Sequence, residues 1–244
     1  MCTASWLTSP APAARLHLLF NRDELGRRTA ASPPRLAQSA TGIGYLAPVD
    51  GASGGTWIAA AETGLLLCLL NRNATRPLPP APRSRGELIP GLIDADGPRG
   101  AMAAFDELDL ADLAPFTLVA MAPGGEPALL RAWDGSRATS AVLPIEAGLL
   151  CSSSLGDERA DRERRPIWER WRAQPLASVA GLRAVHRDHG LFPSAWSVCM
   201  HRDDARTVSF CEVEVGPERI EMRYQGDSPC TAARAHRIAI ARAA

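Results

Sequence analysis

The chain has 244 residues, of which 46% are hydrophobic and 22% charged, and its 27 basic side chains balance 27 acidic ones. This composition is typical of a folded protein with a substantial core, and the zero net charge gives no reason to expect nucleic acid as a partner. All 27 basic residues are arginine. The lack of lysine excludes Walker A nucleotidases, pyridoxal phosphate enzymes and protein kinases, because each needs a lysine for its chemistry.

The compartment and domain organisation follow from what the chain lacks. Its first twenty residues contain no basic segment followed by an apolar one, and no apolar run is long enough to span a bilayer. We therefore expect a cytoplasmic protein without a membrane span. The arginine-only usage, with abundant alanine and proline, is typical of a GC-rich bacterial genome. No linker or internal repeat interrupts residues 1–244, which indicates a single domain.

The N-terminal third is rich in strands. Strands are predicted over Cys2–Leu7 and Arg15–Phe20, joined by a turn at Ser9-Pro10. A hairpin is predicted for Thr56–Glu62 and Leu65–Asn71, whose second arm is apolar on both faces, as in a strand covered on both sides.

The remaining elements alternate between helices and strands. Helices are predicted after a capping box at Ser84-Arg85-Gly86-Glu87, over Ala101–Leu108 and over Asp157–Trp171, with a loop at Pro77–Pro82. Pro166 is expected to kink or restart the third helix, and its Arg159–Arg165 cluster to form a solvated face. Further strands are predicted over Phe116–Met121, Ala128–Trp133, Leu149–Ser152, Trp196–His201, Thr207–Glu214 and Arg219–Tyr224. Strands at both ends with helices between them indicate an α+β fold.

The six cysteines are widely spaced and form no C-x-x-C pair, which gives little support for a structural zinc site or a disulfide framework. Cys68 and Cys199 lie in apolar stretches and are expected to be small buried side chains. His186 and His189 have helical spacing and His201 follows, but no carboxylate motif completes a zinc site. We expect no metal ligands and no resident cofactor.

Cys2 has a special covalent position. Removal of the initiator methionine would leave a thiol and a free α-amino group on one residue. Such an amine has a pKa of about 7.7–8.0 and can act as the base that generates the nucleophilic thiolate. Cys2 is therefore the candidate nucleophile.

Five motifs occur in an order that identifies a family. They are Met1-Cys2, Asn21-Arg22-Asp23-Glu24, Gly54-Gly55-Thr56-Trp57, Asn71-Arg72 and Arg83-Ser84-Arg85-Gly86-Glu87-Leu88. Together they resemble the NRDE family, relatives of transport and Golgi organisation protein 2. The resemblance implies an N-terminal nucleophile (Ntn) hydrolase fold, a four-layer αββα sandwich of two antiparallel sheets. Work on the family has pointed to haem trafficking and to lipid or acyl-CoA metabolism.

The resemblance also implies roles for individual side chains. Cys2 is the nucleophile, Arg22 favours its thiolate, Asp23 holds or orients the α-amine, and Asn71 donates to the oxyanion. The expected substrate-binding side chains are Asn21, Glu24, Trp57 and Arg72.

Two features depart from the family's hydrolase pattern. Arg22 and Asp23 are adjacent, so they point to opposite faces of a regular strand and cannot both face Cys2. One of them is expected to pair structurally with Arg27, Arg28 or Arg72 instead. In addition, Ser152-Ser153-Ser154 stands where relatives carry a Ser-Asn pair. A second polar contributor to the site is thus altered.

Two functions remain open at this stage. One is a cysteine Ntn hydrolase that cleaves an amide or a thioester. The other is a carrier or chaperone that uses the same cleft to bind haem or acyl-CoA. Both imply a small-molecule ligand, and neither fixes the oligomeric state.

Overall fold

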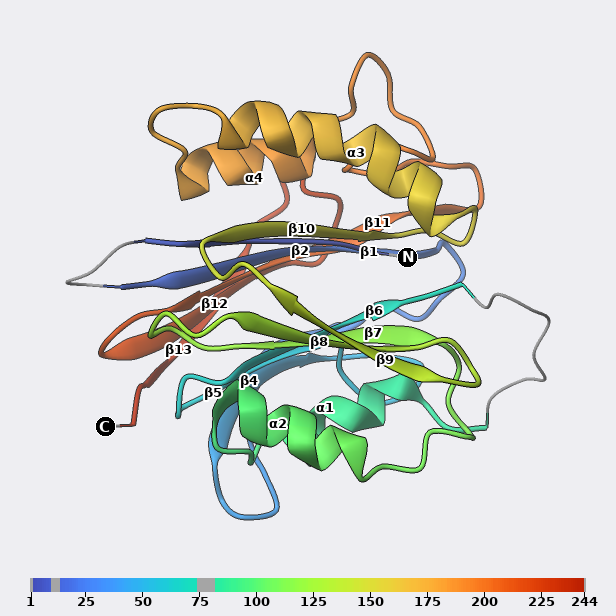
Figure 1. The fold of residues 1–244 in the computed structure, drawn as a ribbon. Coiled ribbons are helices and arrows are strands. Elements are labelled where there is room, and N and C mark those ends of the chain that lie inside the picture. The colour runs from blue at the N-terminus through green and yellow to red at the C-terminus, as the bar shows by residue number, and fades with distance from the viewer. Residues whose placement is uncertain (1, 10–13, 74–81, 244) are drawn as a thin grey trace.

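The computed structural model describes residues 2–9, 14–73 and 82–243. Two antiparallel sheets pack face to face, and helices cover both outer faces (Figure 1). This αββα arrangement confirms the predicted fold class. Among the helices of these residues, none combines the length and apolar composition needed to cross a membrane.

The first sheet has six strands and contains both ends of the described chain. Its strands, in spatial order, are β10 (Ala147–Ser152), β1 (Cys2–Thr8), β2 (Leu16–Leu25), β11 (Ala205–Val215), β12 (Arg219–Gln225) and β13 (His236–Ala241). β1 is thus an inner strand, paired on both sides. β2 extends to Leu25, so the Asn21-Arg22-Asp23-Glu24 motif lies within the strand and its side chains alternate between the two faces.

The second sheet has seven strands in sequence order. They are β3 (Ser32–Gln38), β4 (Gly44–Val49), β5 (Ile58–Ala61), β6 (Leu66–Asn71), β7 (Phe116–Met121), β8 (Ala128–Trp133) and β9 (Ala138–Leu143). The predicted hairpin forms β5 and β6. β3 and β9 were not predicted, because these edge strands expose most of their side chains and show no apolar alternation.

Helices cover the two sheets from outside. They are the 3-10 turn η1 (Arg85–Glu87) with α1 (Leu88–Leu92) and α2 (Gly97–Asp106) on the second sheet, and α3 (Asp157–Arg172) with α4 (Val179–Arg187) on the first (Figure 1). The main core lies between the sheets and includes Cys2, Trp6, Phe20 and Cys68. Two smaller cores fill the spaces beneath the helices.

Several predicted elements differ from the structure. Trp196–His201 is not a strand but a loop, in which only His201 forms a bridge, with Arg206. α3 continues through Pro166 without a break. Its arginine cluster is not wholly solvated, because Arg164 is buried. The turn at Ser9-Pro10 and most of the Pro77–Pro82 loop lie outside the described residues.

Candidate active site

Cys2 lies in a row of side chains that crosses the first sheet. In the strand register, Cys2 pairs with Ser152 on β10 and with Arg22 on β2. Residues paired in this way present their side chains on one face, here the face toward the second sheet. Antiparallel pairing therefore brings together three residues separated by up to 150 positions.

A cleft of about 230 Å³ opens at this end of the sheets. Cys2, Arg22, Glu24, Trp57, Asn71 and Arg85 are among the residues that line it. Five of these six were predicted as site residues; Arg85 was not. The cleft is the place where the motifs of the N-terminal third meet.

Arg22 is held by a carboxylate that the sequence analysis did not identify. Its guanidinium is ion-paired to Asp50 and lies 3.4 Å from Glu24 Oε1, and it stacks 4.3 Å from the ring centre of Trp57. Arg28 also donates to Asp50, with Nη2–Oδ1 and Nε–Oδ2 distances of 2.9 and 3.1 Å. The positive charge of Arg22 is therefore largely compensated.

The ionised state of Asp50 is strongly favoured. Burial raises the pKa of this carboxyl, but hydrogen bonds from Arg28 and Ser53 and the charge of Arg22 outweigh it and bring the pKa to about 2. Asp50 thus stays charged over the physiological range and fixes both arginines.

Asp23 lies on the opposite face of β2, as its position next to Arg22 predicts. Thr207 donates to its Oδ1 at 2.6 Å, and Arg164 of α3 lies 3.5 Å from its Oδ2. Arg164 also donates to Thr3 at 2.6 Å. Burial raises the pKa of Asp23, against the opposing effects of Arg164 and Thr207. The partner of Asp23 is thus Arg164, whereas Arg28 contacts Asp50.

Two predicted substrate-binding residues lie outside the cleft. Asn21 is buried on the helix-covered face, where its amide nitrogen donates to the carbonyl oxygens of His186 and Val198, both at 2.9 Å. Arg72 is exposed and borders a neighbouring hollow together with Ser152 and Asp157. Asn21 therefore helps to hold the segments beneath the helices together, and Arg72 lies beside the cleft rather than in it.

Asn71 ends β6 and borders the cleft. Alternation along β6 places it on the same face as Leu67 and Leu69, which belong to the core beneath the helices. Its side-chain amide makes no hydrogen bond within the described residues. To donate to an oxyanion beside Cys2, the Asn71 side chain would therefore have to turn from this face toward the cleft.

Cys2 itself is 5% exposed. Burial raises the pKa of its thiol, and the charges of Asp23 and Glu24 act in the same direction, against that of Arg22. The thiol therefore needs a nearby base to become a nucleophile at neutral pH.

Close contact between two glycines builds the wall of the cleft. Thr56 N donates to Gly86 O at 3.0 Å, and a Cβ atom added to Gly55 would lie 2.6 Å from the backbone carbon of Gly86. Only glycine allows the Gly54-Gly55-Thr56-Trp57 loop to approach η1 this closely. The contact positions Arg85 beside the cleft, where its Nη1 donates to Pro115 O at 2.8 Å.

Sequence reasoning missed two residues at the site, Asp50 and Arg85, and named a third, Ser152, only within an altered polar segment. Asp50 precedes the Gly54-Gly55 motif, and a carboxylate at the start of this glycine-rich turn could have been recognised as a candidate site residue. Arg85 lies inside a recognised motif but was assigned only to a helix start. Ser152 pairs with Cys2, and its hydroxyl is buried without a hydrogen-bond partner in the described part of the chain. Its position follows only from the strand register.

The overall fold resembles that of a solved amidase, and a second hydrolase structure matches more weakly. The N-acylethanolamine-hydrolyzing acid amidase ortholog of Caenorhabditis elegans matches with a TM-score of 0.60 and 10% identity, covering 95% of this chain and 94% of that chain. The conjugated bile acid hydrolase of Clostridium perfringens, as its C2A mutant, matches with a TM-score of 0.47 and 10% identity, covering 96% of each chain. The fold is that of the Ntn hydrolases.

The sequence comparison identifies the family. The model of the Transport and Golgi organisation 2 family matches residues 1–159, and the chain belongs to this family. No match was found among curated protein sequences. The predicted family membership is thus confirmed.

Proposed function

We propose that this protein is a cysteine N-terminal nucleophile hydrolase that cleaves an amide or a thioester. One observation carries the proposal: Cys2 borders the cleft at the end of an inner strand, in register with Arg22. Because the strands are antiparallel, the nitrogen of Cys2 lies on the side where β2 continues into Asp23. A free amine there would have the buried Asp23 carboxylate as its neighbour.

The amine supplies the base that the buried thiol needs. In the proposed mechanism it accepts the thiol proton while Sγ attacks the carbonyl carbon of the substrate. The tetrahedral intermediate collapses, the carbon–nitrogen or carbon–sulfur bond breaks, and the proton passes to the leaving group. Water then hydrolyses the acyl-cysteine, with the same amine as base, and releases the carboxylic acid. Asp23, held by Arg164 and Thr207, orients the amine.

Two further groups suit the substrate. Arg85 has no carboxylate within ion-pair distance among the described residues, so its charge is available to an oxyanion or to an anionic part of the substrate. The indole N–H of Trp57 is buried and lacks a hydrogen-bond partner within the described ranges. An acceptor on a bound ligand would satisfy it. Arg22, neutralised by Asp50, serves mainly to shape the wall.

The test begins with intact-mass measurement, which reports whether Cys2 is the first residue of the purified protein. A panel of N-acyl amides and acyl thioesters is then incubated with the wild type, Cys2→Ala and the control Cys151→Ser. Cys151 neighbours Ser152 but lies on the other face of β10. We expect turnover and an acyl adduct on Cys2 in the wild type and in the control. Turnover should fall at least about 10³-fold in Cys2→Ala, as for loss of a catalytic nucleophile.

The alternative is a carrier that binds acyl-CoA or haem in the same cleft. The uncompensated charge of Arg85 supports the carrier as much as the hydrolase, because a guanidinium binds carboxylates and phosphates. The volume of about 230 Å³ lies below the range of about 300–1,000 Å³ that is usual for ligand pockets, so the cleft could enclose neither haem nor a whole acyl-CoA molecule. Ligand binding that persists in Cys2→Ala, with no acyl adduct in the wild type, would favour the carrier.

A further inference from the structure

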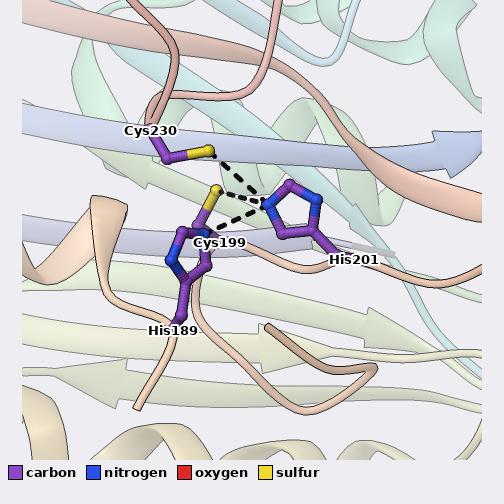
Figure 2. Close-up of side chains that lie close together, drawn as sticks. All are labelled: His189, Cys199, His201 and Cys230. Carbon is purple, nitrogen blue, oxygen red and sulfur yellow. Dashed lines mark hydrogen bonds between the residues drawn. The ribbon is translucent and has the colours of Figure 1, made fainter. Parts of the chain in front are cut away.

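Four side chains that can ligate a metal meet in two connections next to the first sheet, and none of them lines the cleft at Cys2. They are His189, Cys199, His201 and Cys230, and their ligand atoms all lie within 4.8 Å of one another. Figure 2 shows the two sulfur atoms and both imidazole rings turned toward a common point. His189, Cys199 and His201 come from the segment between α4 and β11, and Cys230 from the connection between β12 and β13.

The three spacings from His201 Nε2 fit a tetrahedral zinc site. The distances from His201 Nε2 are 3.1 Å to His189 Nε2, 3.5 Å to Cys199 Sγ and 3.6 Å to Cys230 Sγ. Zinc bonds of about 2.0–2.1 Å to nitrogen and about 2.3 Å to sulfur, at tetrahedral angles, place two nitrogens about 3.3 Å apart and a nitrogen and a sulfur about 3.6 Å apart. The observed distances match within a few tenths of an ångström.

Hydrogen bonding alone does not account for the arrangement. His201 Nε2 contacts another imidazole nitrogen and two sulfur atoms. A neutral imidazole nitrogen carries either one proton or one lone pair, so it can satisfy only one of these contacts well. A cation at the centre would satisfy all four ligand atoms together.

Backbone contacts hold the ligands in place without a metal. Cys199 N donates to Asp188 O at 3.0 Å, and His201 N donates to Ser194 O at 3.0 Å. Ser197 Oγ donates to His189 O, also at 3.0 Å. The ligands are therefore preorganised by a folded loop. Cys199 is buried and Cys230 exposed, which leaves an entry path on the Cys230 side.

We propose that His189, Cys199, His201 and Cys230 bind one structural Zn²⁺ ion. Two imidazoles and two thiolates form a closed four-coordinate set, so no position is left for a substrate. Binding releases the two thiol protons and links the α4–β11 segment to the β12–β13 connection. This inference does not depend on the proposed hydrolase chemistry.

The site is coupled to the buried carboxylate at Asp23. Met200 stands between two of the ligands, and its backbone N–H donates to the Thr207 hydroxyl oxygen at 2.9 Å. The same hydroxyl donates to Asp23 Oδ1 at 2.6 Å. A metal that fixes Cys199 and His201 would therefore also fix the hydrogen bond to Asp23.

The test measures zinc in the full chain, purified under reducing conditions without chelator. We expect one zinc per chain, retained through gel filtration. Cobalt substitution should give visible ligand-field bands and a thiolate charge-transfer band. In Cys230→Ser the zinc affinity, measured against a competing chelator, should fall by more than the roughly 10–100-fold cost of losing an outer-shell partner. His189→Asn should behave likewise. Cys151→Ser and the exposed His236→Asn are the matched controls.

Three outcomes would overturn the proposal. The first is zinc that is absent or lost on gel filtration and does not rebind stoichiometrically. The second is affinity unchanged in folded Cys230→Ser, with folding checked by circular dichroism. The third is a Cys199–Cys230 disulfide, mapped by mass spectrometry, in place of a bound metal. Because Cys230 is exposed, its substitution should leave the apo fold intact, so a loss of affinity reports on coordination.

Discussion

Arg22 and Asp23 are neighbours in the sequence but lie on opposite faces of β2. Arg22 borders the cleft and pairs with Asp50, whereas Asp23 contacts Arg164 and Thr207 beneath the helices. One motif therefore serves two environments. Substitution of Arg22 should therefore alter the cleft, whereas substitution of Asp23 should alter the contacts on the helix-covered face.

Arg85 is expected to bind the anionic part of the ligand. Arg85→Gln should raise KM, or the Kd of a non-hydrolysed ligand, by about 10–100-fold, because a hydrogen bond to a charged group contributes about 1.5–3 kcal/mol. Arg83→Gln is the matched control, since Arg83 is more exposed and pairs with Glu87 at 3.8 Å. Equal effects of the two variants would contradict the assignment.

Asp50 is expected to stabilise the cleft wall. Asp50→Asn should lower the free energy of unfolding by roughly 3–5 kcal/mol, because it leaves the buried Arg22 charge poorly compensated. Urea denaturation measures the effect. Asp106→Asn is the control: the side chain of Asp106 is 49% exposed and pairs with Arg131, so its loss should cost no more than about 1 kcal/mol. A change of similar size in both variants would refute the role given to Asp50.

His186 should make the protein less stable in mild acid. It is buried and hydrogen-bonded to Ser5 and Asn21, and burial, with the charge of Arg164, lowers its pKa from 6.5 to about 3. The unfolded chain therefore binds more protons than the folded one between these pH values. The stabilisation is complete above pH 6.5 and is lost as the pH falls toward 3, by up to about 1.4 kcal/mol per unit.

His186→Gln should flatten this part of the stability curve, measured by urea denaturation at a series of pH values. His236→Gln, at an exposed position on β13, should leave the curve unchanged. A wild-type slope retained in His186→Gln would assign the pH dependence to other groups.

Gly55 is expected to tolerate no side chain. Gly55→Ala places a methyl group 2.6 Å from the backbone of Gly86, so the two loops must separate. We expect a lower melting temperature and weaker ligand binding, because η1 carries Arg85. Gly91→Ala is the control, since a Cβ atom there meets nothing within 4 Å. Normal binding by Gly55→Ala would show that the contact does not position Arg85.

The sequence predicted the fold class and most cleft residues because these depend on local patterns and ordered motifs. Cys2, Arg22 and Trp57 each belong to a recognisable segment. Asp50 was missed because its role arises from tertiary pairing. Ser152 was named as part of an altered polar segment, but no local pattern predicts the strand register that places it beside Cys2. His189 and His201 were considered as metal ligands, but the two cysteines that complete the set were not joined to them, because Cys230 is 29 residues from His201.

The inner position of β1 sets an order of events in biosynthesis. An aminopeptidase must draw an extended chain end into its active site, but Cys2 is held between β2 and β10 in the folded sheet. β10 is synthesised about 150 residues later, so the methionine removal that the proposed hydrolase requires would have to take place while the nascent chain is still unpaired. Rapid overexpression should thus yield a fraction with methionine retained that no later peptidase treatment of the native protein converts. Complete conversion of folded protein would show that this strand opens readily.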